Sequence, residues 1–289
     1  MRPCLAPDSN PHPPRITAPA GTCDTHCHVI GPQSRYPFSE PRSYTPPDSP
    51  VEAYRRLRET LGIARSVIVQ PGAHGFDNTV TTDAIAALGD SARGIAVVPP
   101  DISEGDLAEL DAKGIRGLRL STLLSGGVGT ENIVRMAEKV APLGWHILLH
   151  LKSADELPDL MPMLRHLPVD VVLDHMARVT GVEGVDSAPF QALLELLTRT
   201  DTCWTKVCSW YRLSGEAAPF DDMRVMAEAV LAARPDRVLW GTNWPHPLLF
   251  DGPMPNDGDL MDQFMGWAGT DAVRQAVLVD NPARLYGFR

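Results

Sequence analysis

The sequence predicts a single (β/α)₈ barrel of the TIM type, and three observations favour this fold. Eight short runs rich in apolar and β-branched residues recur along the chain from Thr22 onward. Longer segments with helical period alternate with these runs, and such repeated alternation is typical of a closed parallel barrel. The length of 289 residues suits one such barrel. An open doubly wound sheet is the alternative, but no G-x-G-x-x-G motif follows the first run.

The expected elements follow one another in a regular order. Several strand candidates are continuous apolar runs, as buried parallel strands are. Ser103 with Asp106 resembles a helix N-cap, and Gly114 and Gly144 stand where helix C-caps are expected. The expected strands are 22–28, 66–70, 93–98, 115–121, 145–150, 169–175, 202–208 and 237–242. The expected helices are Val51–Leu61, Asp77–Leu88, Ser103–Lys113, Glu131–Ala141, Ala154–Leu164, Phe190–Thr198 and Asp221–Ala233.

Composition limits the partners and the setting. Residues 1–21 are rich in proline and polar residues, and we expect them to form a leader that either stays mobile or packs along the outside of the barrel of residues 22–289. The net charge of −10, without a basic stripe, argues against nucleic acid and anionic membranes as partners. No apolar run approaches the roughly 20 residues that a bilayer span needs. Five cysteines without a paired framework predict a reduced, cytoplasmic setting. The sequence leaves the oligomeric state open.

Histidines gather at the predicted ends of the strands. In a parallel barrel all strands deliver their last residues to one face, where active sites form. Four of the nine histidines, namely His26, His28, His150 and His175, lie in the last residues of strand candidates. This distribution predicts that they converge on one site.

Each histidine also allows a structural interpretation. His26 and His28 are two residues apart, so on a strand both side chains point to the same side. That spacing suits two ligands of one divalent ion or two donors to one substrate oxygen, although one could be a core histidine and the other a capped loop residue. His175 follows a strongly apolar run, where the alternative is a hydrogen-bonded core imidazole. His150 is equally open to both interpretations.

Three other polar residues lie within or directly after apolar strand candidates. A buried arginine such as Arg119 needs an anion, either a substrate group or an internal carboxylate. Lys206 allows a structural ion pair or a site cation. Asn243 could be a turn residue before Trp244 or a site residue. In a site its amide can donate or accept hydrogen bonds, but it cannot take a proton from water.

Several motifs together resemble one known family. These motifs are Asp24-Thr25-His26-Cys27-His28-Val29, Gly31-Pro32, Ile68-Val69-Gln70, His74-Gly75 with Asp77-Asn78, Arg93-Gly94-Ile95-Ala96-Val97-Val98, Asp174-His175-Met176, Trp240-Gly241-Thr242-Asn243-Trp244-Pro245-His246-Pro247 and Asn281-Pro282. In this order they resemble the amidohydrolase superfamily, in the branch of the 2-pyrone-4,6-dicarboxylate lactonases and galactarolactone isomerases. The resemblance runs from about Thr22 to Phe288.

The resemblance implies a barrel that acts on a small anionic lactone by acyl transfer at the lactone carbonyl. It implies that no metal is required, although a divalent ion on His26 and His28 is possible. The lactone would derive from a small di- or tricarboxylate. The implied catalytic residues are His26, His28, His175 and Asn243. The implied substrate-binding residues are Tyr44, Arg119, Arg178 and Arg212, with His74 nearby.

Two departures from the lactonase pattern leave the reaction open. Asn243 stands where lactonases carry the aspartate that activates water, and the loop 125–127 replaces a second substrate arginine. Lactone hydrolysis would then need a histidine as base, for which His28, His175 and His246 are candidates. Isomerases of the branch resemble this chain in carrying asparagine, so a substrate hydroxyl could attack instead. Those isomerases lack the first histidine of the pair. A catalytically retired ligand-binding barrel and a metal-dependent amidohydrolase or decarboxylase are further alternatives.

Overall fold

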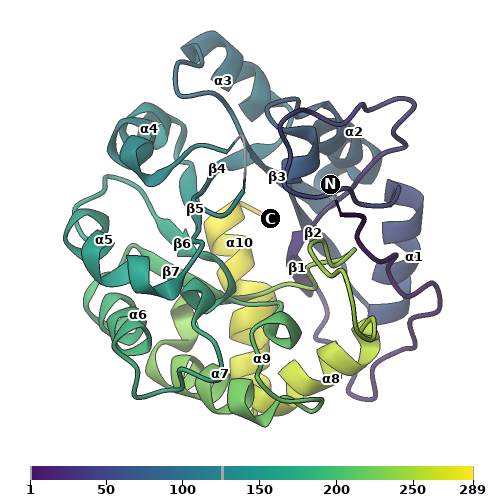
Figure 1. Cartoon of the computed structure of the whole chain (residues 1–289), viewed down its shortest axis with the longest axis vertical. Coiled ribbons are helices and arrows are strands. Elements are labelled where there is room, and N and C mark those ends of the chain that lie inside the picture. The colour runs from purple at the N-terminus through teal and green to yellow at the C-terminus, as the bar shows by residue number, and fades with distance from the viewer. Residues whose placement is uncertain (1, 125–126, 289) are drawn as a thin grey trace.

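The computed structural model describes residues 2–124 and 127–288 and shows eight parallel strands arranged as a barrel (Figure 1). Each strand pairs with the next in the order β1 to β8. The first and last strands meet at their ends, where Thr25 Oγ1 donates to Trp240 O over 2.7 Å. The predicted (β/α)₈ fold is confirmed. The strands are β1 Cys23–Cys27, β2 Arg65–Val69, β3 Ala92–Ala96, β4 Ile115–Ser121, β5 His146–His150, β6 Val171–Leu173, β7 Cys203–Val207 and β8 Val238–Trp240.

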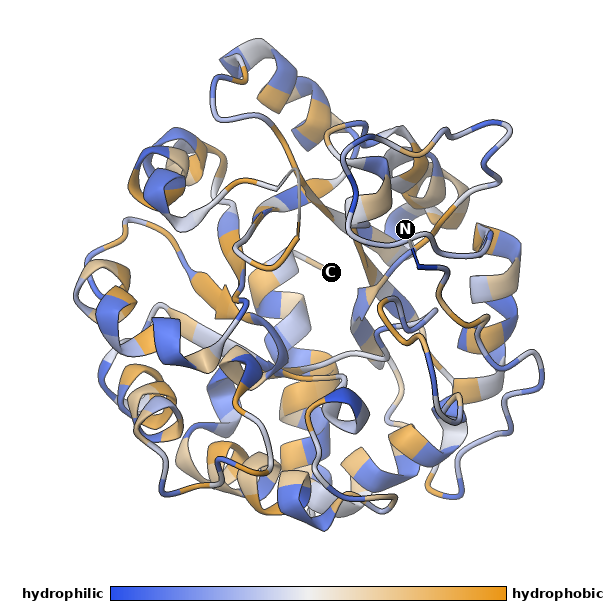
Figure 2. Cartoon of the chain, in the orientation of Figure 1, coloured by the Kyte–Doolittle hydropathy of each residue, from blue (hydrophilic) through white to orange (hydrophobic). Residues whose placement is uncertain are grey.

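Helices surround the strands and turn their apolar faces inward (Figure 2). One large cluster of buried side chains lies between strands and helices, and a smaller one fills the inside of the barrel. Tyr286 and Phe288 from the end of the chain join the inner cluster, so α10 covers the barrel floor. The helices are α1 Val51–Leu61, α2 Thr79–Leu88, α3 Glu104–Ala112, α4 Ile133–Val140, α5 Leu157–Leu164, α6 Ala188–Arg199, α7 Asp221–Ala233, α8 Asp257–Trp267, α9 Asp271–Gln275 and α10 Asn281–Tyr286.

The largest difference from the expected elements concerns the sixth strand. We expected a strand over 169–175, but β6 ends at Leu173. The four residues His175–Arg178 all have positive φ values, between 51° and 64°. Left-handed backbone cannot continue a strand, and it is uncommon for residues other than glycine. The turn therefore changes the direction of the chain at the point where His175 enters the site.

The leader packs along the outside of the barrel. Cys4 N donates to Thr45 O and Leu5 N donates to Leu249 O, both over 2.8 Å. Further along, Arg15 forms an ion pair with Asp262 of α8 at 2.9 Å. The leader thus joins the loop that follows β1 to the loop that follows β8.

Two expectations from composition can be compared with the structure. None of the five cysteines, all within the described residues, forms a disulfide. Among the described helices, none combines the length and apolar character needed to cross a bilayer. Ser125 and Gly126 of the loop that replaces the second arginine lie outside the described residues.

Candidate active site

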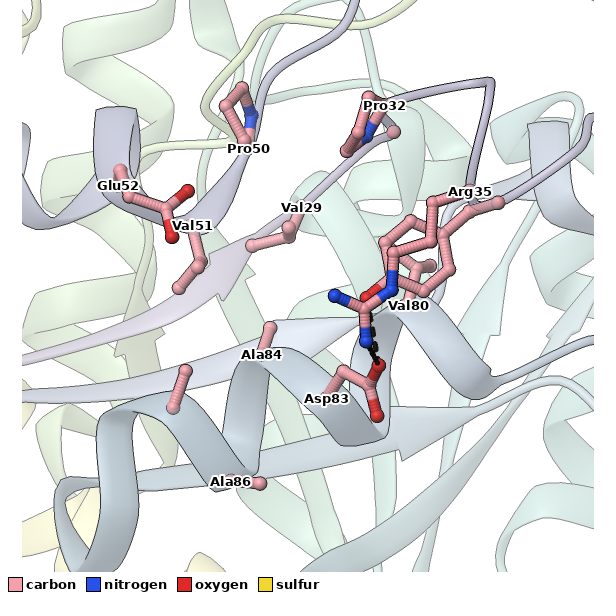
Figure 3. A pocket seen from close by; sticks show the side chains of 13 residues that line it. Val29, Pro32, Arg35, Pro50, Val51, Glu52, Val80, Asp83, Ala84 and Ala86 are labelled. Atoms are coloured by element: carbon pink, nitrogen blue, oxygen red, sulfur yellow. Dashed lines mark hydrogen bonds and ion pairs between the residues drawn. The ribbon is translucent and has the colours of Figure 1, made fainter.

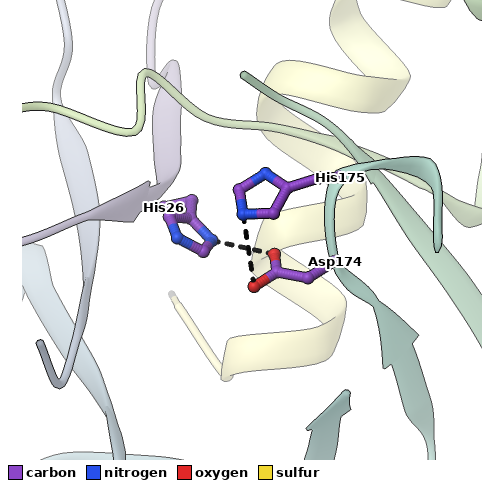
Figure 4. Close-up of side chains that lie close together, drawn as sticks. All are labelled: His26, Asp174 and His175. Carbon is purple, nitrogen blue, oxygen red and sulfur yellow. Dashed lines mark ion pairs between the residues drawn. The ribbon is translucent and has the colours of Figure 1, made fainter. Parts of the chain in front are cut away.

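Buried imidazoles and a carboxylate meet where β1 and β6 end (Figure 4). His26 Nδ1 lies 3.0 Å from Asp174 Oδ1, and His175 Nε2 lies 3.7 Å from Asp174 Oδ2. The ring of His26 lies 5.0 Å from that of His28 and 4.9 Å from that of His175, measured between centroids. The predicted convergence of strand-end histidines is therefore present in the fold.

The close approach of β8 to β1 fixes the position of His26. A Cβ atom at Gly241 would lie 2.5 Å from the Cβ of His26, so only glycine is accommodated there. Directly after it, Asn243 N donates to His26 O over 2.7 Å, and Asn243 itself has a φ of 59°. Asparagine tolerates this left-handed backbone better than most residues. The local sequence thus turns the Asn243 side chain toward the site.

Asp24 links the end of β1 to the residues that follow β8 through hydrogen bonds. Its Oδ1 accepts hydrogen bonds from the backbone N–H groups of His26 and Thr242, both at 3.0 Å. Its Oδ2 accepts from Thr242 Oγ1 at 2.6 Å and from Tyr54 Oη at 2.9 Å. Burial raises the pKa of the Asp24 carboxyl, and these hydrogen bonds oppose the shift. All four donors are neutral, so Asp24 has a structural role.

Asp174 is equally buried but has positive neighbours. Arg119 Nη2 lies 3.6 Å from its Oδ2, and the Lys206 ammonium lies 3.4 Å from His26 Nδ1, the atom that faces Asp174 Oδ1. Neither carboxylate oxygen makes an aligned hydrogen bond to a described residue. Burial raises the pKa of Asp174, but the attraction of His175, Lys206 and Arg119 outweighs it and lowers the pKa to about 2. Asp174 is therefore a carboxylate at neutral pH.

The hydrogen bonds of His28 and His150 define which ring nitrogen carries the proton. His28 Nδ1 contacts the carbonyl oxygen of Val69 at 2.8 Å, so Nδ1 donates and Nε2 keeps its lone pair. His150 Nδ1 accepts from Arg119 Nη2 at 2.9 Å, so the proton of a neutral His150 is on Nε2. Burial lowers the pKa of His28 to about 3 and that of His150 well below its usual value. Both imidazoles are neutral at neutral pH.

These groups line a small cavity at the strand ends. Its wall combines neutral imidazoles with two guanidinium groups, one amide and one phenol. Such a lining suits a small molecule with anionic substituents and a polarised carbonyl group. The lining residues are His28, Tyr44, Arg119, Leu124, His150, His175, Arg212, Asn243, Pro247 and Leu248.

A wider surface pocket lies elsewhere, between the loop after β1 and helix α2 (Figure 3). Arg35 forms an ion pair with Asp83 at 2.7 Å there, and Tyr36 Oη donates to the same carboxylate at 2.7 Å. This pocket holds no strand-end histidine. In a barrel enzyme the catalytic groups stand at the strand ends, so the smaller cavity is the candidate active site.

Known proteins share this architecture and much of the sequence. The profile of the family described as Amidohydrolase matches residues 23–288. This chain belongs to the amidohydrolase family. The family assignment agrees with the resemblance seen in the sequence motifs.

Several amidohydrolase relatives are named for lactones. The chain is 40% identical to a 2-pyrone-4,6-dicarboxylate hydrolase from Comamonas testosteroni, over 96% of this chain and 94% of the relative. It is 38% identical to a 4-sulfomuconolactone hydrolase from Hydrogenophaga intermedia, over 98% and 94% of the two chains. A D-galactarolactone isomerase from Agrobacterium fabrum is 30% identical over 94% and 93%.

A solved structure of a probable 2-pyrone-4,6-dicarboxylic acid hydrolase from Acinetobacter baumannii, with citric acid bound, is also similar. It is 28% identical and superposes with a TM-score of 0.79, over 93% of this chain and all of that one.

Most of the residues expected in the site lie at the cavity of this amidohydrolase. His28, His175 and Asn243 line it, and His26 lies beside them against the rings of His28 and His175. Of the residues expected to bind substrate, Tyr44, Arg119 and Arg212 also line the cavity.

Arg178 and His74 are not among the lining residues. Arg178 is partly buried and its Nε donates to Lys152 O over 3.4 Å. His74 packs against the ring of Phe38, and its Nδ1 lies 3.2 Å from Pro37 O. Substrate binding by either residue stays a prediction.

Sequence reasoning missed one residue of the site and left two undecided. Asp174 stands only within a motif there, although a carboxylate directly after an apolar strand is a usable signal. His150 was open to a structural or a site role; it lines the cavity and accepts a hydrogen bond from Arg119. Lys206 was undecided between a structural and a site role; its Nζ donates to Thr25 O over 2.7 Å and lies 3.4 Å from His26 Nδ1.

A group of three residues has metal-ligand character. One ligand atom from each of His26, Asp174 and His175 lies within 4.8 Å of the others. This group shares His26 with the pair expected to hold a divalent ion, but it does not include His28. The Lys206 ammonium lies 3.4 Å from the Nδ1 atom of His26, and Arg119 lies 3.6 Å from Asp174. A divalent cation would enter a buried space that already contains two positive side chains, so the donor set fits a metal ion poorly.

Proposed function

We propose that this chain is a lactone hydrolase that acts on a small lactone with anionic substituents. The observation that carries the proposal is the cavity itself, where neutral imidazoles face Arg119 and Arg212. The relatives at 38–40% identity that are named as lactone hydrolases support it. The names of those relatives include a dicarboxylate and a sulfonated lactone, so we propose carboxylate or sulfonate as the anionic substituent.

The two cavity arginines supply the affinity for such a substrate. Arg212 Nη1 donates to Pro247 O over 2.7 Å and Nη2 to Ser209 Oγ over 3.1 Å, which fixes the guanidinium in place. Its Nε atom is buried and has no partner among the described residues. Guanidinium groups bind carboxylate and sulfonate through paired, charge-assisted hydrogen bonds. Arg212 and Arg119 would therefore orient the lactone by its substituents.

His150 is the donor best placed for the lactone carbonyl. Its Nε2–H is buried without a partner among the described residues, while Arg119 occupies its Nδ1. An N–H donor in a buried cavity stabilises the negative charge that forms on a carbonyl oxygen under attack. His150, together with the positive charge of Arg119, would form the oxyanion site in this scheme.

We further propose that hydrolysis requires no metal. The positive charge that a metal ion would bring to Asp174 is already supplied by Lys206 and Arg119. The chain itself therefore contains the cations that this buried carboxylate needs.

Lactone isomerisation is the second candidate, and Asn243 is the observation that favours it. Asn243 lines the cavity and cannot act as a base toward water. A substrate hydroxyl held near the carbonyl could then become the acyl acceptor. The relative at 30% identity named as a D-galactarolactone isomerase makes this outcome worth testing.

A paired assay separates the two reactions. The chain is incubated with pyrone carboxylates, sulfomuconolactones and lactones of sugar diacids, with a pH indicator beside proton NMR. Hydrolysis releases a proton, whereas isomerisation changes the NMR spectrum without acid. Acid release supports the lactone hydrolase, and NMR change without acid supports the isomerase. Tight binding of these lactones without turnover would support a ligand-binding barrel.

We propose one barrel domain with an outer N-terminal leader as the functional unit. Five unpaired cysteines suit a reducing compartment, and we propose the cytoplasm.

A further inference from the structure

A chain of polar residues leads from the cavity into the protein behind Asn243. Asn243 Nδ2 donates to Tyr211 Oη over 3.0 Å, and Tyr211 Oη lies 2.8 Å from His246 Nδ1. His246 Nε2 lies 3.4 Å from both carboxylate oxygens of Asp257. His246 and Asp257 are almost fully buried, at 0% and 1% exposure.

The direction of each hydrogen bond follows from what its partner can do. Asp257 can only accept when ionised, so it takes the Nε2–H of His246 and leaves Nδ1 of His246 as an acceptor. Tyr211 O–H then donates to that Nδ1, and its oxygen accepts from the Asn243 amide. The side-chain oxygen Oδ1 of Asn243 receives no hydrogen bond from a described residue. It is therefore available to hold a water molecule in the cavity.

We propose that Tyr211, His246 and Asp257 form a proton relay that activates water in place of the base that Asn243 cannot be. The inference rests on the proposed lactone hydrolysis. Tyr211 would be the catalytic residue: it lies directly behind the cavity wall, and its hydrogen bond to the Asn243 amide would place its oxygen next to a water held by that amide. His246 and Asp257 act through Tyr211 and are positioning residues, in the manner of a histidine oriented by a carboxylate.

The proton balance of the step is complete. The water oxygen bonds to the lactone carbonyl carbon, and the water proton passes to Tyr211 Oη as the phenol proton passes to His246 Nδ1. The resulting imidazolium is paired with Asp257, and the carbonyl electron pair moves to the oxygen atom. When the tetrahedral centre collapses, the bond to the ring oxygen breaks. The proton returns through Tyr211 to that leaving oxygen.

The surroundings suit this role. Burial raises the pKa of Tyr211 to about 12, so its phenol stays protonated and can donate to His246. Asn243 and His246 both have positive φ values, 59° and 63°, and His246 N donates to Asn243 O over 2.7 Å. Strained backbone of this kind at non-glycine residues is often found where side chains are held for chemistry.

The decisive experiment combines Tyr211→Phe with Asn243→Asp. Tyr211→Phe removes the phenol, and we expect kcat for lactone hydrolysis to fall about 100-fold while KM changes by less than about threefold. Tyr36→Phe is the matched control, because it removes a similar hydroxyl that is bonded to Asp83 in the other pocket and does not line the cavity. In the Tyr211→Phe chain, Asn243→Asp should recover at least about tenfold of the lost kcat, since a carboxylate can take the proton directly.

The outcomes separate failure of the relay from failure of the proposed function. If the wild-type chain releases no acid from any lactone, the lactone hydrolase and the relay both fall. If the wild-type chain is active and kcat of Tyr211→Phe stays within about threefold of the wild-type value, the relay is contradicted but the lactone hydrolase proposal is not. A loss that Asn243→Asp does not recover would also overturn the relay, because it would reflect a structural defect. Unfolding curves of each variant accompany the kinetics.

A measurement on the wild-type chain keeps the test independent of variant folding. The relay moves two protons in one step, so kcat plotted against the deuterium fraction of the solvent should curve. A straight line would mean that a single proton moves and would overturn the relay. The Asn243→Asp chain should give the straight line, because its carboxylate bypasses the relay.

Discussion

Two aspartates at the strand ends, Asp24 and Asp174, have the same burial and opposite surroundings. Both are fully buried, and both lie within contact distance of His26 groups. Asp24 accepts four hydrogen bonds from neutral donors, whereas Asp174 has cations nearby and no aligned hydrogen bond to a described residue. The pKa is raised at Asp24 and lowered to about 2 at Asp174. The carboxyl group of Asp24 accepts hydrogen bonds from neutral donors only and holds backbone segments in place. The carboxylate of Asp174 has cations as neighbours, so it stays ionised and its negative charge can act on the site.

The largest effect is expected from Asp174→Asn. This change removes the counter-charge of Lys206 and Arg119 and the anion that faces His26 and His175. We expect kcat to fall about 1,000-fold. Leaving buried cations unpaired should also lower the free energy of unfolding by about 3–5 kcal/mol. Steady-state kinetics and urea unfolding measure the two effects. A kcat of Asp174→Asn close to that of the wild-type chain would contradict the site role that distinguishes Asp174 from Asp24.

Asp24→Asn should affect stability and spare catalysis. The new amide still accepts at one oxygen but loses acceptor capacity toward Tyr54 and Thr242. We expect the free energy of unfolding to fall by about 2–3 kcal/mol. Below the melting temperature, kcat should fall less than about tenfold. Urea unfolding and kinetics on the same preparation test this, and a kcat loss larger than that of Asp174→Asn would reverse the assignment of roles.

The two variants should also differ in their pH dependence. Asp174 has a folded pKa below its unfolded value, so its stabilisation is present above about pH 4 and is lost as the pH falls toward 2. The folded pKa of Asp24 is raised, so its carboxyl group keeps its proton to a higher pH in the native state than in the unfolded state. Its contribution to the free energy of unfolding therefore declines as the pH rises above about 4. The stability difference between wild type and variant should therefore shrink on acidification for Asp174→Asn and grow for Asp24→Asn. Urea unfolding between about pH 2 and 6 measures it; the same trend in both variants would contradict the pKa directions.

The smallest effect is expected from removing metal ions. Because Lys206 and Arg119 already neutralise Asp174, dialysis against a chelator should leave kcat of the wild-type chain within about twofold. Lys206→Met is the comparison variant for metal binding. It removes the ammonium beside His26, so that a cation could bind to His26, Asp174 and His175. Titration with Co²⁺ should give a bound-metal absorption spectrum for Lys206→Met and none for the wild-type chain. Loss of wild-type activity on chelation would establish a metal enzyme instead.

The barrel fold and the convergence of the strand-end histidines could be predicted from the sequence because both depend on local patterns. Apolar runs of strand length and their alternation with helices define the fold, and residues at the ends of parallel strands must converge. The expected bounds of α1 and α7 match the structure, because helical period and helix-terminating residues define both helices. The sixth strand was predicted too long because an apolar run does not reveal the left-handed turn that begins at His175.

The pairings inside the site depend on distances across the barrel, which no local pattern contains. Lys206 lies on β7 yet contacts Thr25 and His26 of β1, and barrel closure alone brings them together. In the same way, Tyr211 and His246 lie in segments 35 positions apart in the chain. A single sequence shows that each residue is present but not that they are partners.

The leader has a practical consequence for anyone who prepares this protein. Its backbone is bonded to Leu249 in the loop that carries His246, and Asn256 of the same loop contacts Asp8 through a 2.8 Å hydrogen bond. A terminal segment tied down in this way cannot be altered as freely as a frayed one. Affinity tags fused to the amino terminus, or proteolytic trimming during purification, would act on the loop that positions Asp257. Preparations tagged at the carboxyl and amino ends should be compared before their kinetic constants are pooled.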